Sequence, residues 1–311
     1  MNRYSKVPNF IILSFILLLA VHPCFAQDNA VLSGPYFGQD PPELEPLVFA
    51  KGIIDYDIHG CPVFTPDGKE AYWTVMKTFK MMHSKEVNGV WTPPDTFQFS
   101  LEFDASDAPC LSPDGNRLFF LSYEEKVSGS GREHVDNIRY MDRVEGGWSE
   151  PQLVGSGIND FKTHWQFSIA NNGSIYFGAK ETGNGDIYVS RFENGIYQPA
   201  EVLGSNINSE HYDYSPFIDP NENYIIFSRT VGDARKDYAD LYISFKDGDG
   251  NWSKAVPMEA LNTRVHEMNP NVTRDGKYLF FLRNTWGNNW DGSSTHWVSA
   301  RIIDRYKTSE N

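Results

Sequence analysis

Five similar turn-and-strand segments predict an all-β fold made of repeated four-stranded units. In each segment a tight-turn signal is followed directly by a strand rich in aromatic and β-branched residues. The turns recur about every 50 residues, a spacing typical of the blades of a β-propeller. No helical periodicity is visible beyond residues 1–26. The sequence therefore predicts a β-propeller, a ring of small antiparallel sheets around a central channel.

The turn signals are short runs that contain Pro, Asp, Asn and Gly. Pro fixes one turn dihedral and Gly accepts a positive φ, so a Pro-Asp-Gly run favours a tight hairpin turn. A short apolar strand, a, precedes each turn, and the aromatic strand, b, follows it. The five turns lie at 65–68, 112–115, 171–173, 219–221 and 274–276.

Two further strands complete each repeat. Strand c carries an aromatic residue, as at 138–140, 186–188, 240–242 and 296–298. A second turn leads into strand d, which is marked by Trp91, Trp148, Tyr197 and Trp252. The fifth repeat ends after strand c, near Asp304, so residues 46–51 are predicted to supply its strand d and close the ring. Five blades are favoured, and a sixth, degenerate blade from residues 28–60 is the alternative.

Several phrases of the repeats follow a known pattern, at 112–120, 147–151, 275–281 and 297–300. They resemble the PD40, or TolB-like, propeller repeat, which is related to WD40-like repeats, and the resemblance covers roughly residues 46–304. It implies a propeller fold. It implies no single function, because this repeat serves periplasmic scaffolds, peptidase propellers and a few carbohydrate lyases. Asn172 and Asn221 stand where the pattern usually has Asp, and both lie in turns.

The N-terminus has the features of a cleaved export signal. Arg3 and Lys6 precede an almost continuously apolar run over 10–21, and Ala26 offers a small residue at a cleavage point. The run is too short for a confident membrane span, and no other segment approaches the required length. We expect a periplasmic or extracellular protein; a lipid anchor on Cys24 is the alternative.

The chain divides accordingly into a signal peptide and one folded domain. We expect a signal peptide over 1–26, an N-terminal extension over 27–45, a single propeller domain over 46–305 and a C-terminal tail over 306–311. The formal net charge of −14 argues against nucleic-acid binding, which needs a basic surface. Cys61 and Cys110 are the cysteines left in the mature chain, and we interpret them as buried small hydrophobic residues.

A binding site is predicted on one face of the propeller. The a–b and c–d turns lie on one face of each blade, and the b–c connections lie on the other. The b–c connections are long at 124–135, 231–238 and 284–295. Because binding residues concentrate on variable loops over a rigid scaffold, we expect the site on the b–c face, above the channel.

Polar residues recur where each strand a enters the channel. Eight residues before the turn Asp or its equivalent stand His59, Ser106, His164, Asp213 and Glu267. Asp107 follows Ser106 and could replace it. Imidazole and carboxylate groups are ligands for zinc, manganese and similar ions, so a divalent-metal site is predicted from His59, Asp107, His164, Asp213 and Glu267. The alternative is that these side chains hydrogen-bond between blades or to channel water.

Cationic and aromatic residues supply further candidates for ligand binding. Lys180, Arg229 and Arg283 lie eight residues after the turn in the last three repeats and could hold a carboxylate or sulfate. The alternative is that each pairs with a neighbouring acid such as Glu181 or Asp213. The tryptophans that could stack on a sugar are Trp165, Trp286 and Trp290.

Two functional hypotheses follow, since no catalytic motif is evident. The first is an exported, non-catalytic propeller that binds a ligand or protein partner on its b–c face. The second is a carbohydrate-active enzyme, a lyase or hydrolase, acting on acidic oligosaccharides. In the second, the three cations would hold the substrate carboxylate, and His59 or His164 would transfer the proton, with or without a metal. Part of the second hypothesis comes from the family resemblance.

Overall fold

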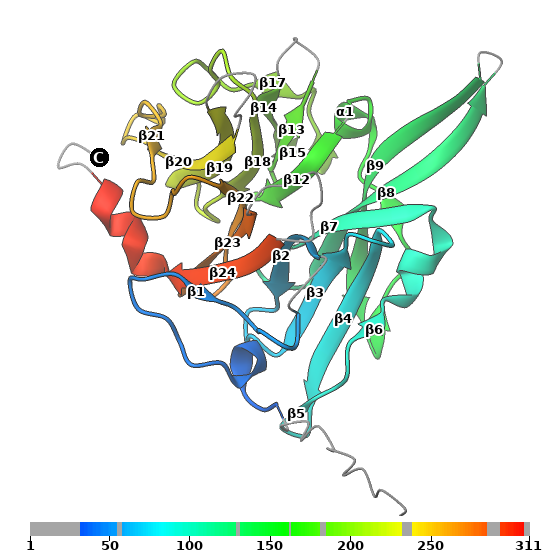
Figure 1. The fold of residues 1–311 in the computed structure, drawn as a ribbon. Helices are drawn as coiled ribbons and strands as arrows, with labels where there is room; N and C mark the ends of the chain where they lie inside the picture. The colour runs from blue at the N-terminus through cyan, green and yellow to red at the C-terminus, as the bar shows by residue number, and fades with distance from the viewer. Residues whose placement is uncertain are drawn as a thin grey trace, which may run out of the picture. The chain divides into compact units, whose positions relative to one another are not determined.

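The computed structural model describes residues 32–54, 58–128, 131–161, 163–180, 185–231, 238–284 and 293–307, with the backbone alone at 125–128, 131–135, 156, 163–165 and 231. Five antiparallel sheets of this part of the chain form a ring, so the predicted five-bladed propeller is confirmed (Figure 1). The predicted signal peptide lies outside the described residues. None of the helices within them is long and apolar enough to cross a membrane.

Each blade runs from an inner strand a to an outer strand d. Blade 1 contains β2 (Ile58–Phe64), β3 (Glu70–Val75), β4 (Lys80–Val87), β5 (Val90–Trp91) and β6 (Asp95–Thr96). Blade 2 contains β7 (Ala105–Leu111), β8 (Arg117–Ser128), β9 (Gly131–Val144), β10 (Gly147–Trp148) and β11 (Gln152–Leu153). Blade 3 contains β12 (Thr163–Ile169), β13 (Ile175–Ala179), β14 (Asp186–Ser190) and β17 (Glu201–Val202), with the small hairpin β15 (Phe192–Glu193) and β16 (Ile196–Tyr197).

The last two blades follow the same order. Blade 4 contains β18 (Asp213–Ile218), β19 (Tyr224–Val231), β20 (Tyr238–Phe245) and β21 (Val256–Pro257). Blade 5 contains β22 (His266–Val272), β23 (Tyr278–Asn284), β24 (Ser293–Ser299) and β1 (Leu47–Val48). The short helical segments are η1 (Pro35–Gly38), η2 (Gln98–Glu102), α1 (Ser156–Asn159) and η4 (Ala300–Tyr306).

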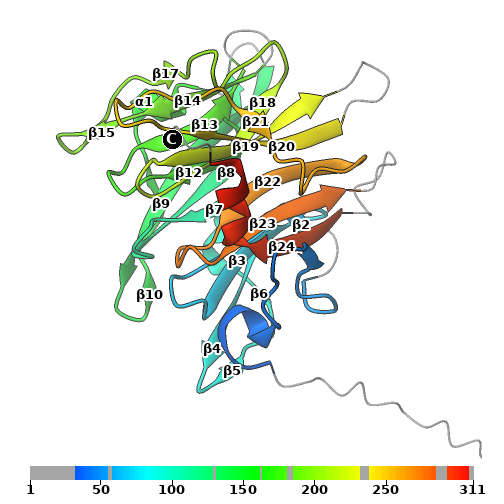
Figure 2. The same cartoon turned by 90° about the vertical axis from the view of Figure 1, so that its left-hand side faces the viewer.

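An N-terminal strand closes the ring, as predicted. β1 pairs with β24 in the register Leu47 to Trp297 and Val48 to His296 (Figures 1 and 2). Phe49 then turns into the core and is only 1% exposed. Residues of the predicted N-terminal extension also pack on the propeller, because the backbone N–H of Tyr36 donates to the carbonyl of Gly68 at 2.9 Å.

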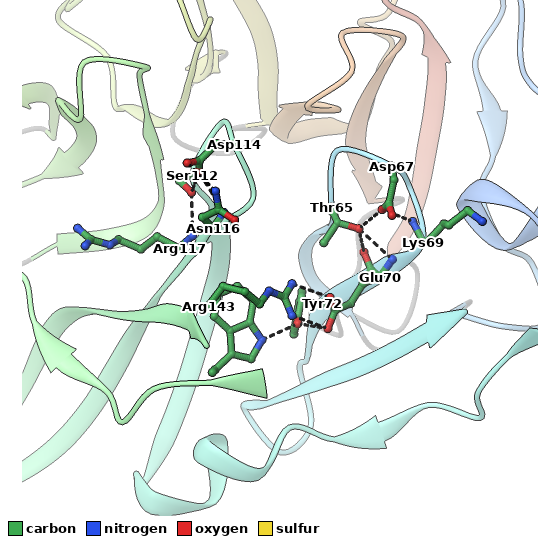
Figure 3. A network of polar contacts seen from close by, with 11 residues as sticks. Thr65, Asp67, Lys69, Glu70, Tyr72, Ser112, Asp114, Asn116, Arg117 and Arg143 are labelled. Atoms are coloured by element: carbon green, nitrogen blue, oxygen red, sulfur yellow. Dashed lines mark hydrogen bonds and ion pairs between the residues drawn. The ribbon is translucent and has the colours of Figure 1, made fainter. Parts of the chain in front are cut away.

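The turn motifs are held by their own side chains. The Thr65 hydroxyl donates to Asp67 Oδ1 at 2.6 Å, and the same oxygen accepts the Lys69 N–H at 3.1 Å (Figure 3). Ser112 donates to Asp114 in the same way, at 2.5 Å. The Thr or Ser hydroxyl two residues before the turn Asp therefore stabilises the a–b turn by hydrogen bonding to that Asp.

The outer strand of blade 1 comes in two pieces. Trp91, predicted to mark strand d, lies in β5 and pairs with Glu86, whereas the second piece, β6, pairs with the middle of β4. Pro93 and Pro94 separate the pieces because proline has no N–H for the ladder. In blades 3 and 4 the predicted markers lie outside strand d. Tyr197 belongs to the separate hairpin β15–β16 and Trp252 to an isolated bridge, whereas strand d is Glu201–Val202 in blade 3 and Val256–Pro257 in blade 4.

A long b–c loop is predicted at 124–135 in blade 2, but the strands of the blade continue into this segment. β8 and β9 continue as an antiparallel ladder from the Glu124–Val135 pair to the Ser128–Gly131 pair. They form a two-stranded arm that extends beyond the blade (Figure 1). Most of the other two long connections, at 232–237 and 285–292, lies outside the described residues.

Asparagine side chains fasten the links that follow blades 2, 3 and 4 to the preceding strand c. Asn208 Oδ1 accepts the N–H of Ile187 at 2.8 Å, and its Nδ2 donates to the carbonyl of the same residue at 3.0 Å. Asn159 brackets Ile138 and Asn262 brackets Leu241 in the same manner. Because these links lead directly into the inner strands, the brackets fix where the next strand a enters the channel.

Candidate ligand site at the channel mouth

The inner strands carry charged side chains at the end of the channel that faces the b–c connections. This end is called the channel mouth here, and it is formed where strands a begin and strands b end. His59 lies near the start of β2 and Asp107 near the start of β7, while Asp213 and Glu267 lie at the start of β18 and β22. The structure therefore brings four of the predicted metal-site residues to one end of the channel.

Two of these residues form a buried pair between blades 1 and 2. The distance between His59 Nδ1 and Asp107 Oδ2 is 2.7 Å, and the two side chains are 5% and 0% exposed. Burial lowers the pKa of His59, but the charge and hydrogen bond of Asp107 outweigh burial and raise it above its ordinary value. The second oxygen of Asp107, Oδ1, has no hydrogen-bond partner within the described residues. The pair therefore favours a protonated imidazole and keeps a carboxylate oxygen unused.

Replacing Asp107 with Asn is expected to change how stability depends on pH. A raised pKa of His59 in the folded state stabilises the protein below the unfolded value of about 6.5, and this stabilisation is lost as pH rises through the folded value. Asn keeps the shape and a hydrogen bond but removes the charge. Urea unfolding between pH 5.5 and 8.5 should show the largest deficit of Asp107→Asn near pH 6. A deficit that is independent of pH would show that His59 is not protonated by this contact.

Blades 4 and 5 each carry an arginine–carboxylate pair at the mouth. Arg229 Nε lies 2.6 Å from Asp213 Oδ1, and Arg283 Nε lies 2.8 Å from Glu267 Oε1. Both carboxylates are fully buried. In each pair the arginine and the acid are direct neighbours across strands a and b.

Further donors from the blade links complete these pairs. The backbone N–H and the hydroxyl of Ser209 both donate to Asp213 Oδ2, each at 2.8 Å. The backbone N–H of Thr263 donates to Glu267 Oε2 at 3.0 Å, and its hydroxyl donates to Oε1 at 2.7 Å. The second guanidinium nitrogen of Arg229 donates to the carbonyl of Ile207 at 2.5 Å. Both carboxylates are thus supplied with hydrogen bonds, which lowers the cost of burying them.

The described side chains do not form the predicted ring of metal ligands. Among the described side chains, no group of three or more His, Cys, Asp or Glu is placed to hold a metal ion. The His164 side chain is not described, so the five-residue site remains a prediction. A metal at Asp213 or Glu267 would have to displace a guanidinium group.

The other predicted ligand-binding residues are placed as follows. Arg229 and Arg283 pair with carboxylates of their own blades, as the alternative interpretation expected. Lys180 is exposed just after β13. Only the backbone of Trp165 is described, and Trp286 and Trp290 lie outside the described residues. Ser106 is buried, and its hydroxyl lies 2.5 Å from that of Ser100.

Half-buried aromatic rings that the sequence analysis did not single out lie at the mouth. The ring of Phe79 is 5.1 Å from that of His59 and 6.5 Å from that of Tyr123. Burial and the charge of Asp107 raise the pKa of Tyr123, so its hydroxyl stays protonated. On blade 4 the rings of Tyr212 and Tyr214 stack at 4.9 Å. The mouth therefore combines charged pairs with flat apolar surface.

Asp240 is a further residue at the mouth that the sequence analysis did not single out. It lies opposite Arg229 in the ladder between β19 and β20. Burial, and then the charge of Glu267, raise the pKa of Asp240 to about 6. Its Oδ1 has no hydrogen-bond partner within the described residues. The available signal was the parallel between Asp186-Ile187-Tyr188 and Asp240-Leu241-Tyr242 at the start of strand c.

Side chains bridge the channel below the mouth. Gln166 of blade 3 donates to the carbonyl of Pro270 in blade 5 at 2.8 Å, and Arg274 of blade 5 donates to the carbonyl of Leu111 in blade 2. These blades are not neighbours in the ring, so both contacts cross its centre. A cavity of about 20 Å³ beside them has room for about one water molecule. A larger ligand would therefore bind at the mouth without passing through the channel.

Comparison with known proteins finds solved structures that are similar to this chain. No protein-family model matches the sequence, and no curated protein matches it. TolB from Acinetobacter baumannii is 13% identical with a TM-score of 0.46, over 77% of this chain and 56% of that one. An endo-arabinase from Bacteroides thetaiotaomicron is 15% identical with a TM-score of 0.45, over 85% and 96%. An α-L-arabinanase from Cellvibrio cellulosa, solved with arabinohexaose, is 16% identical with a TM-score of 0.45, over 82% and 99%.

Proposed function

We propose that this chain is an exported protein that binds an uncharged carbohydrate at the channel mouth. The observation that carries the proposal is the combination of buried charged pairs and half-buried aromatic rings at one end of the channel. Buried ion pairs add little to stability, because desolvation offsets most of their attraction. Charged groups held in such surroundings are concentrated at functional sites. Export rests on the apolar N-terminal segment over 10–21.

The chemistry of the mouth suits a ligand rich in hydroxyl groups. Asp107 Oδ1 and Asp240 Oδ1 are buried acceptors without partners in the described part of the chain, so a sugar hydroxyl can donate to them once the side chains that cover them move aside. The rings of Phe79 and Tyr123 offer apolar surface to the C–H face of a sugar. An acidic oligosaccharide is less well matched, since Arg229 and Arg283 already bind carboxylates and the protein carries a net charge of −14.

Hydrolysis of a glycosidic bond at the same mouth is the second candidate, and Asp240 favours it. A carboxyl group with a pKa of about 6 is partly protonated in mildly acidic solution, where it can act as a general acid. Glu267, held by Arg283 and Thr263, is the neighbouring acid whose charge raises that pKa. Asp240 would donate its proton to the leaving oxygen while water attacks the anomeric carbon and releases a proton to solvent, from which Asp240 is protonated again.

Calorimetric titration with neutral oligosaccharides tests the proposal. The mature protein should bind at least one of arabinohexaose, xylohexaose, cellohexaose and maltohexaose. His59→Ala and Tyr123→Ala should each weaken that binding by about tenfold or more. Lys254→Ala, an exposed change on blade 4, is the control and should bind like the wild type. No binding at millimolar sugar, or equal binding by all variants, would refute a carbohydrate site at the mouth.

The same samples distinguish binding from hydrolysis. Chromatography of the sugar after prolonged incubation should show no shortening if the protein only binds. Shortened products that disappear with Asp240→Asn, while affinity is kept, would establish the hydrolase instead.

A further inference from the structure

A second groove lies on the opposite face of the propeller, between blades 1 and 2. It encloses about 630 Å³, which is within the size range of small-molecule sites. Glu70 at the start of β3 and the hairpin that carries Arg143 and Trp148 line it together with residues of β4, β6 and η2. The start of β3 and this hairpin belong to the face of the a–b and c–d turns, so the groove is separate from the channel mouth.

One wall of the groove is a rigid polar network. Arg143 Nη2 donates to Glu70 Oε2 at 2.6 Å, and the Tyr72 hydroxyl donates to Glu70 Oε1 at 2.5 Å (Figure 3). The Trp148 indole N–H donates to the Tyr72 hydroxyl at 2.8 Å, and the Arg143 guanidinium lies 3.9 Å from the centre of the Trp148 ring. These contacts fix both rings before any ligand arrives, which reduces the entropic cost of binding.

The floor of the groove is a row of side chains across blade 1. Tyr72 lies opposite His83 in the ladder, and His83 lies opposite Asp95. Residues opposite one another project from the same face of a sheet, so an aromatic ring, an imidazole and a carboxylate stand in line. The rings of Tyr72 and His83 stack at 6.3 Å. His83 Nδ1 is buried and makes no hydrogen bond within the described residues, so Nε2 is the ring nitrogen that would meet a ligand in the groove.

Blades 3 and 4 show which of these residues serve only to join blades. There the Tyr176 hydroxyl donates to Glu222 at 2.7 Å, and Lys246 pairs with Glu222 and lies 4.8 Å from the ring centre of Trp252. The network of tyrosine, acid, cation and tryptophan is thus a repeated brace between blades. The corresponding row there is Tyr176, Val189 and Glu201. Valine replaces histidine in an otherwise similar brace, so blade packing does not require His83.

We propose that this groove binds one residue of an uncharged sugar, with His83 as a hydrogen-bonding partner. Its charged lining consists of two acids, Glu70 and Asp95, and two bases, Lys85 and Arg143, so an ionic ligand gains no net attraction. A sugar hydroxyl both donates and accepts hydrogen bonds, and therefore suits a mixed lining of this kind. The half-buried ring of Trp148 offers apolar surface beside these groups, and the fully buried Tyr72 holds it in place through the indole hydrogen bond. The inference does not depend on the proposed site at the mouth.

The test is made in a His59→Ala background, where binding at the mouth is weakened. Arabinohexaose, xylohexaose, cellohexaose and maltohexaose are titrated while the indole N–H signals are followed by NMR, with Trp148 assigned through Trp148→Phe. At least one sugar is expected to shift the Trp148 signal. His83→Val, the residue found in blade 3, should weaken that binding by about tenfold or more with an unchanged melting temperature. Trp252→Phe, in the matching brace, is the control and should leave it unchanged.

The outcomes separate this groove from the mouth. Binding that moves the Trp148 signal and is weakened by His83→Val but not by His59→Ala supports the groove alone. Binding that is lost with His59→Ala and unaffected by His83→Val supports the mouth and overturns the groove. A Trp148 signal that no sugar moves also overturns it.

Discussion

Replacing Arg229 with Met should lower the free energy of unfolding by about 3–5 kcal/mol at pH 7, because it leaves a buried carboxylate without its cation. Asp213 is fully buried and Arg229 is 12% exposed, so water cannot take the place of the guanidinium without rearrangement. Met keeps much of the side-chain volume that packs over Phe227 and Tyr242. The loss therefore reports the unpaired charge more than lost packing.

Two companion variants separate charge from packing. The double variant Asp213→Asn with Arg229→Met removes both charges and should recover much of the lost stability, since neutral pairs avoid the desolvation cost. Arg117→Met breaks the exposed pair between Arg117 and Asp142 and should cost no more than about 1 kcal/mol. Urea unfolding gives all three values. Equal losses for Arg229→Met and Arg117→Met would contradict a desolvated pair at the mouth.

The loss should also depend on pH. Burial already raises the pKa of Asp213 above its ordinary value against the opposing charge of Arg229, so removing Arg229 should raise it further. Stability of Arg229→Met should therefore fall as pH increases from about 4 to the raised value, and the deficit should be smaller at pH 4 than at pH 7. A deficit that stays constant over this range would indicate lost packing instead.

The fold was predictable because its signals are local. Each a–b turn is specified by three or four adjacent residues, and Thr65 or Ser112 bonds to an Asp only two positions away. Even the arginine–acid pairs were present in the sequence. Asp213 and Arg229 lie eight residues before and after one turn, and equal distances from a hairpin turn make two residues cross-strand neighbours. The interpretation that each cation pairs with a neighbouring acid therefore holds for Arg229 and Arg283, and the separate carboxylate ring and cation patch are one row of pairs in these two blades.

Contacts between blades could not be predicted from the sequence. The pairing of His59 with Asp107 and of Glu70 with Arg143 depends on how neighbouring sheets pack, and no periodicity reports that distance. The raised pKa of Asp240 follows from burial and from Glu267, a residue of another blade. The arm of β8 and β9 was missed for a different reason: its residues continue a ladder that composition alone does not distinguish from a loop.

Phe49→Ala should destabilise the protein by about 3–5 kcal/mol, the cost typical of removing a buried phenylalanine ring. Phe49 is 1% exposed, and its ring lies 4.9 Å from those of both Phe280 and Trp297 in blade 5. It also lies 5.7 Å from the ring of Phe64 in blade 1. One side chain thus joins the first and last blades, where the ring is closed by residues from opposite ends of the chain.

Leu47→Ala is the matched control for ring closure. Leu47 lies in the same strand and pairs with Trp297 through the backbone, but its side chain is 49% exposed. Its truncation should change stability by no more than about 0.5 kcal/mol. If Phe49→Ala behaved like Leu47→Ala, closure would rest on backbone pairing alone. A large loss for Phe49→Ala, with one cooperative transition retained, would show that packing at this junction holds the five blades as a single unit, and hence holds the pairs of blades 1, 2, 4 and 5 around one mouth.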